Sequence, residues 1–281
     1  MLNTFIGLIY GGVGAGSYLF AKYISSNGGL DIACVVSLIL FLVHFILWPK
    51  LVITAFYDWR SVLRGFLYGV SQIFLLVAQS KMPTSSMLIF SIAGSLAGCW
   101  FGRIILRDHL STNETLAVLV ATVGIIIGFI GKADISTWAL TGGLIQGITT
   151  ATARSLMNTN VAKRAVVGSG LLMFGIITFI WLLLTNDLPS VTKIPPMWIV
   201  VGVIALAIIQ YTFIYVHQIY NTQKATLFSL LRAPWSVIME LILFKTSVST
   251  LTTISSSMIF LSAGLALYRP KQCCKEVNKK C

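Results

Sequence analysis

The feature that most constrains this chain is a succession of long apolar runs that are almost free of charge. Only 10% of the 281 residues are charged and 57% are hydrophobic, whereas soluble domains usually carry about 25% charged residues. Inside a bilayer every backbone amide must be paired within the protein, so a spanning segment is either a helix or a strand of a closed barrel. The apolar runs are continuous and do not alternate with polar residues, which favours helices. The sequence therefore predicts an all-α integral membrane protein.

The length of the chain sets the number of spans. One helical span needs roughly 20 apolar residues, so we expect about ten transmembrane helices and no separate soluble domain. The first apolar run has no basic region before it and no small-residue cleavage site, so we expect a retained helix. The expected spans are 3–23, 30–48, 61–79, 85–106, 114–131, 137–157, 166–185, 196–218, 225–244 and 250–268.

The basic residues predict the orientation of these spans. The net charge is +12, but the lysines and arginines are spread over successive loops and form no single patch with interleaved aromatic residues, so we expect no nucleic-acid partner. With a cytoplasmic N-terminus, most basic residues, including Arg64, fall at inner span ends and in the tail. The outer ends then keep only Lys22, Lys81, Lys132, Lys193 and Lys245. By the positive-inside rule both termini are expected in the cytoplasm.

The reactive side chains do not indicate an enzyme. The five cysteines have neither a zinc spacing nor a disulfide framework. Three of them, Cys273, Cys274 and Cys281, lie in the tail, where we expect free thiols or, alternatively, lipidation. The sequence contains no nucleophile elbow, no metalloprotease motif and no pair of carboxylates placed for hydrolysis. We therefore expect no catalytic residues, no metal and no cofactor.

The two halves of the sequence resemble each other. The segment GLIYGGVGA at residues 7–15 matches GLIQGITTA at residues 143–151, an offset of 136 residues. Further along, the offset becomes 138 and pairs Gln72 with Gln210. Because each half holds five expected spans, an odd number, the halves must lie in opposite orientations, which is the inverted-repeat plan of many transporters. The expected division is an N-terminal five-helix repeat at 1–135, an inverted five-helix repeat at 136–268 and a basic cytoplasmic tail at 269–281.

With this repeat in place, the chain resembles the drug/metabolite transporter superfamily, specifically its ten-helix EamA-like branch. The clearest resemblance is at residues 86–130, where a helix rich in small residues, a short acidic turn with Asp108 and a glycine-containing helix follow one another. The second copy, residues 227–267, has the same outline but no acid at the turn. The resemblance implies a central cavity that opens alternately to the two sides of the membrane.

Charge within an apolar span is the main sign of a functional site, because burying charge in a bilayer is costly. The range 225–244 contains four polar residues that fall within about 80° of one another on a helix. These residues are Ser229, Arg232, Ser236 and Glu240. The two charges are separated by roughly 12 Å along the helix axis, and we expect them to bracket a zwitterionic solute. The alternative is that each is neutralised by a neighbouring helix or reaches an interface.

Pro234 adds a local break to this face. It follows Arg232 by two residues and cannot donate the hydrogen bond that would normally reach the carbonyl of Leu230. A broken helix beside a buried cation is a recurring feature of substrate sites in transporters. A kink that only shapes the bundle is the equally expected alternative.

The repeat also singles out two glycines and two glutamines. The positions that match Arg232 and Ser236 in the first half are Gly94 and Gly98, which favour either close helix packing or open space for a solute. Gln72 and Gln210 lie near the middle of their spans and must face something polar, either a solute or another helix. Tyr211 and Tyr215 are weaker candidates for lining the same cavity.

These observations lead to one expected function and two alternatives. The resemblance and Arg232 together favour a secondary transporter that moves a small polar metabolite, amino-acid-like and either zwitterionic or anionic, by alternating access. Efflux of lipophilic or quaternary cations is the first alternative, and a channel is the second. The expected partners are the solute and the lipid bilayer, with a homodimer left open. The expected location is the bacterial inner membrane.

Overall fold

The structure, a computed structural model, is all-helical across the residues that it describes. These are residues 2–24, 29–106, 111–130, 136–157, 163–220, 222–243, 245 and 247–267. No strand occurs within these ranges. The predicted tail, 269–281, and the acidic turn at Asp108 lie outside them.

Thirteen helices follow one another along the described ranges. They are α1 (Leu2–Ile24), α2 (Leu30–Leu47), α3 (Pro49–Tyr57), α4 (Trp59–Lys81), α5 (Thr84–Leu106), α6 (Thr112–Ile130), α7 (Thr137–Met157), α8 (Lys163–Thr185), α9 (Leu188–Val191), α10 (Pro196–Ile219), α11 (Thr222–Leu230), α12 (Arg232–Ile242) and α13 (Thr250–Leu267).

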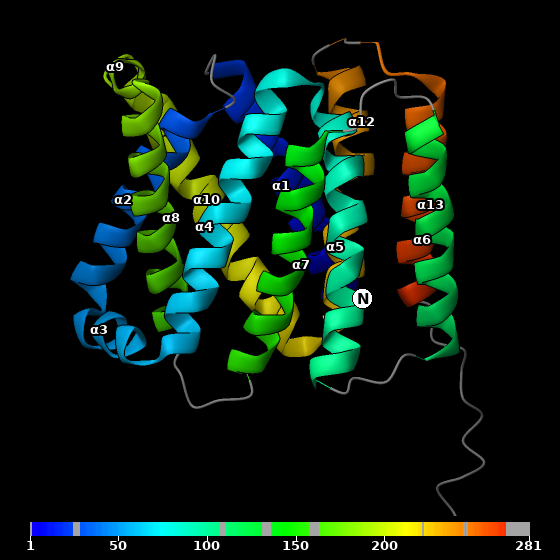
Figure 1. Cartoon of the computed structure of the whole chain (residues 1–281), viewed down its shortest axis with the longest axis horizontal. Coiled ribbons are helices and arrows are strands. Elements are labelled where there is room, and N and C mark those ends of the chain that lie inside the picture. The colour runs from blue at the N-terminus through cyan, green and yellow to red at the C-terminus, as the bar shows by residue number, and fades with distance from the viewer. Residues whose placement is uncertain are drawn as a thin grey trace, which may run out of the picture.

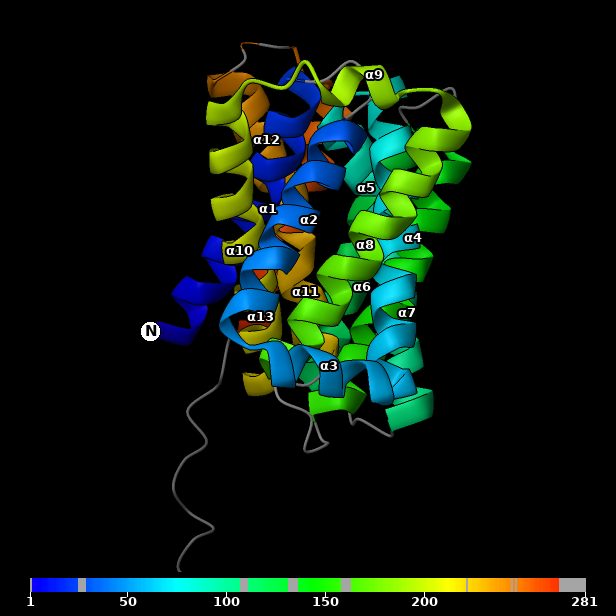
Figure 2. The same ribbon diagram turned by 90° about the vertical axis from the view of Figure 1, so that its left-hand side faces the viewer.

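The long helices stand side by side in one bundle, and the short helices α3 and α9 lie at its ends (Figure 1). Helix α3 lies across one end, which we call the α3 end, and α9 lies at the opposite end, the α9 end (Figure 2). Helix α13 finishes at the α3 end, and α1 begins in the same half of the bundle. Helices α6 and α13 pack against each other at one side.

Six segments are long and apolar enough to cross a membrane: Leu30–Leu47, Trp59–Lys81, Thr112–Ile130, Arg164–Thr185, Pro196–Ile219 and Ala225–Ile242. Two shorter apolar helical segments, Thr84–Leu96 and Thr250–Ala266, accompany them. Large apolar side chains on these helices are exposed, including Leu119, Ile126 and Ile204. This composition and surface are consistent with an integral membrane protein.

The helices begin and end within a few residues of the predicted ranges, with three differences. Residues 49–57, which lay between two expected spans, form α3; its buried residues are Val52 and Ala55. Helix α9 is a second short addition. The predicted range 225–244 is interrupted at Leu231, which separates α11 from α12. Pro234, which lacks an amide hydrogen, explains why the helix is not continuous there.

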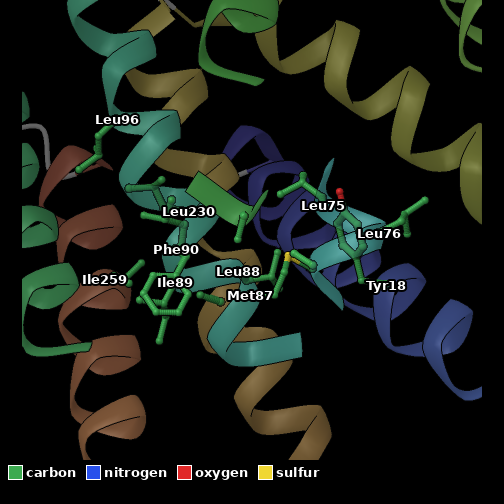
Figure 3. Close-up of a cluster of buried hydrophobic side chains, with 14 of the residues drawn as sticks. Tyr18, Leu75, Leu76, Met87, Leu88, Ile89, Phe90, Leu96, Leu230 and Ile259 are labelled. Atoms are coloured by element: carbon green, nitrogen blue, oxygen red, sulfur yellow. The ribbon is translucent and has the colours of Figure 1, made fainter. Parts of the chain in front are cut away.

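The core between α1, α4, α5 and α13 is tightly filled with apolar side chains (Figure 3). Tyr18 of α1 lies beside Leu75 and Leu76 of α4, and Phe90 of α5 lies near Ile259 of α13. The ring of Phe90 also packs on Phe129, with centroids 4.9 Å apart. This packing fixes the positions of α1 and α4, which carry the polar side chains described next.

Candidate functional site

A cavity lies inside the bundle, between α1, α2, α4, α7, α8, α10 and α12. Its space not filled by atoms is about 820 Å³, including the part open to the surroundings. One end reaches Gly29 and Phe20, where α1 is followed by α2 near the α9 end. The other end, which we call the floor, contains Arg232, Tyr68 and Phe213 near the middle of the bundle. The cavity therefore extends from the middle of the bundle toward the α9 end.

Arg232 is the charged group at the floor. It begins α12 directly after the interruption at Leu231, and only 8% of the residue is exposed. Its Nη2 donates a hydrogen bond to the hydroxyl of Tyr10, and its guanidinium carbon lies 4.8 Å from the centre of the Tyr10 ring. Its Nε has no hydrogen-bond partner among the described residues, and no described carboxylate forms an ion pair with it. A buried cation with only neutral partners is an attractive site for an anion.

Glycines of α1 create the space for this arginine. A Cβ atom at Gly14 would lie 2.8 Å from Nε of Arg232, and one at Gly11 would lie 2.7 Å from Cβ of Leu231. Larger residues at these positions would push α1 away from α12 or displace the guanidinium. The glycine-rich run of α1 therefore determines how closely the cation approaches the cavity.

A chain of neutral hydrogen bonds forms one side of the cavity. The hydroxyl of Tyr18 donates to Oε1 of Gln72 at 2.7 Å, and Nε2 of Gln72 donates to Oε1 of Gln146 at 3.1 Å. Ser71 also donates to Oε1 of Gln146, at 3.0 Å. These bonds tie α1, α4 and α7 together and orient the amides of two glutamines beside the cavity.

Gln210 lies on α10, elsewhere in the cavity wall. Only 2% of the residue is exposed, and it makes no hydrogen bond with the residues that the structure describes. Most other wall residues are apolar or aromatic, including Leu76, Phe174 and Leu206. The cavity thus offers one cation, several amide groups and apolar walls, which suit a small molecule with an anionic end and a hydrogen-bonding body.

The structure brings three of the ten residues predicted for the site to this cavity. They are Gln72, Gln210 and Arg232. Gln72 makes interhelical hydrogen bonds, which is one of the two roles that the sequence left open for it, and it also lines the cavity.

Glu240 lies away from the cavity wall, at the opposite end of α12 from Arg232. Its Oε1 accepts a hydrogen bond at 3.2 Å from the backbone amide of Ser85, in the first turn of α5. A carboxylate at this position satisfies a free helix amide and complements the positive end of the helix dipole. This position fits the alternative in which Glu240 interacts with a neighbouring helix better than a role in which Glu240 and Arg232 hold the two ends of a solute.

The other polar candidates are also outside the cavity wall. Ser229 and Ser236 donate to backbone carbonyls of their own segment, at Thr226 (2.6 Å) and Ala233 (2.7 Å). Tyr211 hydrogen-bonds to Nε2 of His44 at 2.7 Å. Tyr215, like Tyr211, is exposed on the outer side of α10.

Gly94 lies where α5 crosses α7. A Cβ atom there would lie 2.3 Å from the backbone nitrogen of Leu144, and one at Gly143 would lie 2.0 Å from the carbonyl oxygen of Ser91. The two backbones are therefore in direct contact, as the packing alternative requires. The surroundings of Gly98 lie outside the described side chains.

Sequence reasoning missed the aromatic and arginine neighbours of Arg232. Tyr10 contacts Arg232 directly, and Tyr18 and Tyr68 line the same cavity. Arg64, assigned to a cytoplasmic span end, is fully buried. One signal was available: Tyr10 is paired by the repeat with Gln146, so both halves carry a polar group at that position.

Comparisons with known proteins support the fold alone. No protein-family model and no curated protein matches the chain. Solved structures do match, 29 chains in all. One of them, described only as "Crystal structure of protein", has a TM-score of 0.70 with 14% sequence identity, and the match covers 94% of this chain and 96% of that one. At this identity the similarity establishes that the two chains share a fold.

Proposed function

We propose that this protein is a secondary transporter for a small metabolite that carries a carboxylate or similar anionic group, with amino-acid-like zwitterions as the leading class. The observation that carries the proposal is Arg232, a buried cation at the floor of the cavity whose described contacts are all neutral. Retaining an unpaired charge inside an apolar bundle is costly, and an anionic solute would supply the missing partner.

The rest of the cavity fits the body of such a solute. The amides of Gln72, Gln146 and Gln210 offer hydrogen bonds to an ammonium or hydroxyl group. Apolar walls formed by Leu76, Phe174 and others accept a side chain. A solute carboxylate at Arg232 would place these groups within the same cavity.

We further propose ten membrane spans in two inverted five-helix repeats, with α11 and α12 forming one span. The helix pairings support this division. Helix α5 packs on α7, and its repeat partners α11 and α12 pack on α1; likewise α4 packs on α8, and α10 packs on α2. A pseudo-twofold relation between the halves would produce such reciprocal pairs and would place the cavity on the axis between them.

The same arrangement suggests the transport mechanism. The cavity extends toward the α9 end, while Tyr10 and Phe213 close the bundle below Arg232, with ring centroids 6.1 Å apart. Movement of one repeat against the other would close the cavity toward the α9 end and open it toward the α3 end. We also propose that the protein is related to the ten-helix EamA-like transporters, which its sequence resembles.

Efflux of lipophilic cations is the second candidate. The observation that favours it is the aromatic content of the wall, because the rings of Phe20, Tyr68 and Phe174 offer faces to a cation. The positive charge of Arg232 opposes it, since a cation at the floor would be repelled.

Uptake into proteoliposomes tests the proposal. Purified protein is assayed with a panel of labelled L-amino acids and with the corresponding amino acid amides, which lack the carboxylate. We expect saturable counter-exchange of at least one amino acid and none of its amide. Arg232→Ala should abolish this exchange, and Arg232→Lys should restore it in part, because a point charge lacks the planar guanidinium fork.

Arg60 provides the matched control, since it is an exposed arginine at the start of α4. Arg60→Ala should exchange amino acids like the wild type. Wild-type exchange by Arg232→Ala, or equal transport of acids and amides, would overturn the proposal. Selective exchange of a quaternary ammonium probe would favour the second candidate.

A further inference from the structure

Arg64 is a second buried cation that the cavity does not include. It lies in the second turn of α4, toward the α3 end, and 0% of the residue is exposed. Its Nη1 donates to the carbonyl of Val166 at 3.1 Å. Its Nε and Nη2 have no hydrogen-bond partner, and no carboxylate among the described residues pairs with it. Of its donor nitrogens, two therefore remain unused inside the protein.

The surroundings of Arg64 are shaped around its guanidinium. A Cβ atom at Gly170 would lie 2.8 Å from Nη1, so a larger residue there would displace the guanidinium. The rings of Phe213 and Tyr68 lie on other sides, 5.3 and 5.7 Å from the guanidinium carbon. Aromatic faces stabilise the cation in part but leave its in-plane donors free.

Two aromatic rings connect Arg64 with Arg232. The Tyr10 ring contacts the guanidinium of Arg232, the Phe213 ring contacts that of Arg64, and the two rings contact each other. Tyr68 and Phe213 belong to the cavity floor. Arg64 therefore lies directly behind the floor, on the side toward the α3 end, where the opposite opening of the cavity would have to form.

We propose that Arg64 is a second anion-binding group, which receives the solute's carboxylate from Arg232 when the cavity opens toward the α3 end. This inference rests on the proposed function. It assigns Arg64 to the part of the transport cycle in which the floor residues Tyr68 and Phe213 have moved and the cavity is open toward the α3 end. Displacement of the Phe213 and Tyr68 rings would expose the unused Nε and Nη2 of Arg64 to the solute. Two cations in sequence would keep the carboxylate partnered throughout its passage.

Arginine-selective modification tests the site without requiring the natural solute. The full-length protein in detergent is treated with phenylglyoxal, with acetate as the carboxylate probe and acetamide as its neutral control. Modification of Arg64, Arg232 and exposed Arg60 is then followed by peptide mass spectrometry. We expect acetate to slow modification of both buried arginines and acetamide to slow neither. Arg60 should react equally under all conditions.

The outcomes separate this inference from the proposed function. If acetate protects Arg232 while Arg64 is never modified, or is modified at an unchanged rate, the inference is wrong and the proposed function stands. If acetate protects neither arginine, the carboxylate role fails for both residues, and the proposed function fails with it.

Variants supply a second, independent measurement. Arg64→Met should retain thermal stabilisation by the exchanged amino acid, because Arg232 is intact, but should lose about tenfold or more in exchange rate, as expected for a lost charged hydrogen bond. Arg64→Lys should recover part of the rate, and Arg60→Met should change nothing. Gly170→Ala, which displaces the guanidinium and retains the charge, should slow exchange as well.

Two results would contradict the proposed transfer of the carboxylate from Arg232 to Arg64. Wild-type exchange by Arg64→Met shows that no solute uses the residue. A melting temperature that falls on replacing chloride with gluconate in the wild type, but not in Arg64→Met, shows that Arg64 holds a resident inorganic anion.

Discussion

At the scale of single residues, the buried arginines Arg232 and Arg64 each lie against a glycine of a neighbouring helix. Gly14 of α1 faces Arg232, and Gly170 of α8 faces Arg64. A guanidinium needs a planar space with free edges, and the absence of a Cβ on the opposing helix provides it. The position of each charge is therefore set by a residue on another helix, in addition to the arginine itself.

Gly14→Ala tests this relation for Arg232. The new Cβ would lie 2.8 Å from Nε of Arg232, so the guanidinium must move. We therefore expect a higher KM for amino acid exchange, while the melting temperature changes little. Gly12→Ala is the matched control, because its Cβ would meet only Trp235, at an ordinary 3.6 Å. An equal effect of both substitutions would show that α1 responds to added bulk in general, without a specific role for Gly14.

The sequence predicted the site residues whose polarity is unusual in a membrane span. Arg232, Gln72 and Gln210 stood out because charge and amides are costly in hydrocarbon. Tyr10, Tyr18 and Tyr68 did not, because tyrosine is amphipathic and ordinary in membrane helices. Arg64 was assigned to a span end, since its depth depends on where α4 begins, and α4 begins at Trp59, before the predicted range. Gly14 was missed because a glycine's partner is known only once the helices are placed.

At the scale of helices, α5 and α7 cross with their backbones in direct contact. A Cβ atom at Gly94 would lie 2.3 Å from the nitrogen of Leu144. We expect Gly94→Ala to lower the melting temperature and the transport rate together, with Leu worse than Ala. Gly264→Ala is the control, because no atom lies within 4 Å of its added Cβ. A loss of transport by Gly94→Ala at an unchanged melting temperature would restore the alternative in which this face is open space.

Glu240 links α12 to the beginning of α5. Its contact with the amide of Ser85 predicts that Glu240→Gln lowers stability by roughly 1 kcal/mol, through loss of a charged partner at a helix N-terminus. The pH dependence of exchange should stay as in the wild type. Thermal unfolding and exchange measured across pH check both expectations. A changed pH profile without a change in melting temperature would instead assign the carboxylate to proton coupling.

Helix boundaries followed well from hydropathy, whereas the short elements did not. An apolar run of about 20 residues reveals a span directly. Helix α3 has only nine residues, too few to span, and it packs on α8, where Val52 lies beside Gly168. The separation of α11 from α12 was one of two outcomes that Pro234 allowed, and both helices pack on α1.

At the scale of the whole molecule, the basic residues and the cavity lie toward opposite ends of the bundle. Basic residues gather at the α3 end, where Lys50 lies in the first turn of α3, Arg60 in the first turn of α4 and Arg164 in the first turn of α8, which packs on α3. Arg164 lies over the ring of Trp48, 4.5 Å from its centre. The cavity extends toward the other end. Under the positive-inside rule we expect this conformation to present the proposed solute site to the outside.

Cysteine labelling tests that orientation. In a cysteine-free background, Lys193→Cys, which follows α9, should react with a membrane-impermeant maleimide added to intact cells. Lys50→Cys in α3 should react only after the membrane is permeabilised, because the α3 end is expected in the cytoplasm. Both positions are exposed in the structure, so a difference in reactivity reports the side of the membrane and not burial. The opposite pattern would place the cavity opening in the cytoplasm, and Arg64 would then be the first cation that an outside solute reaches and Arg232 the second.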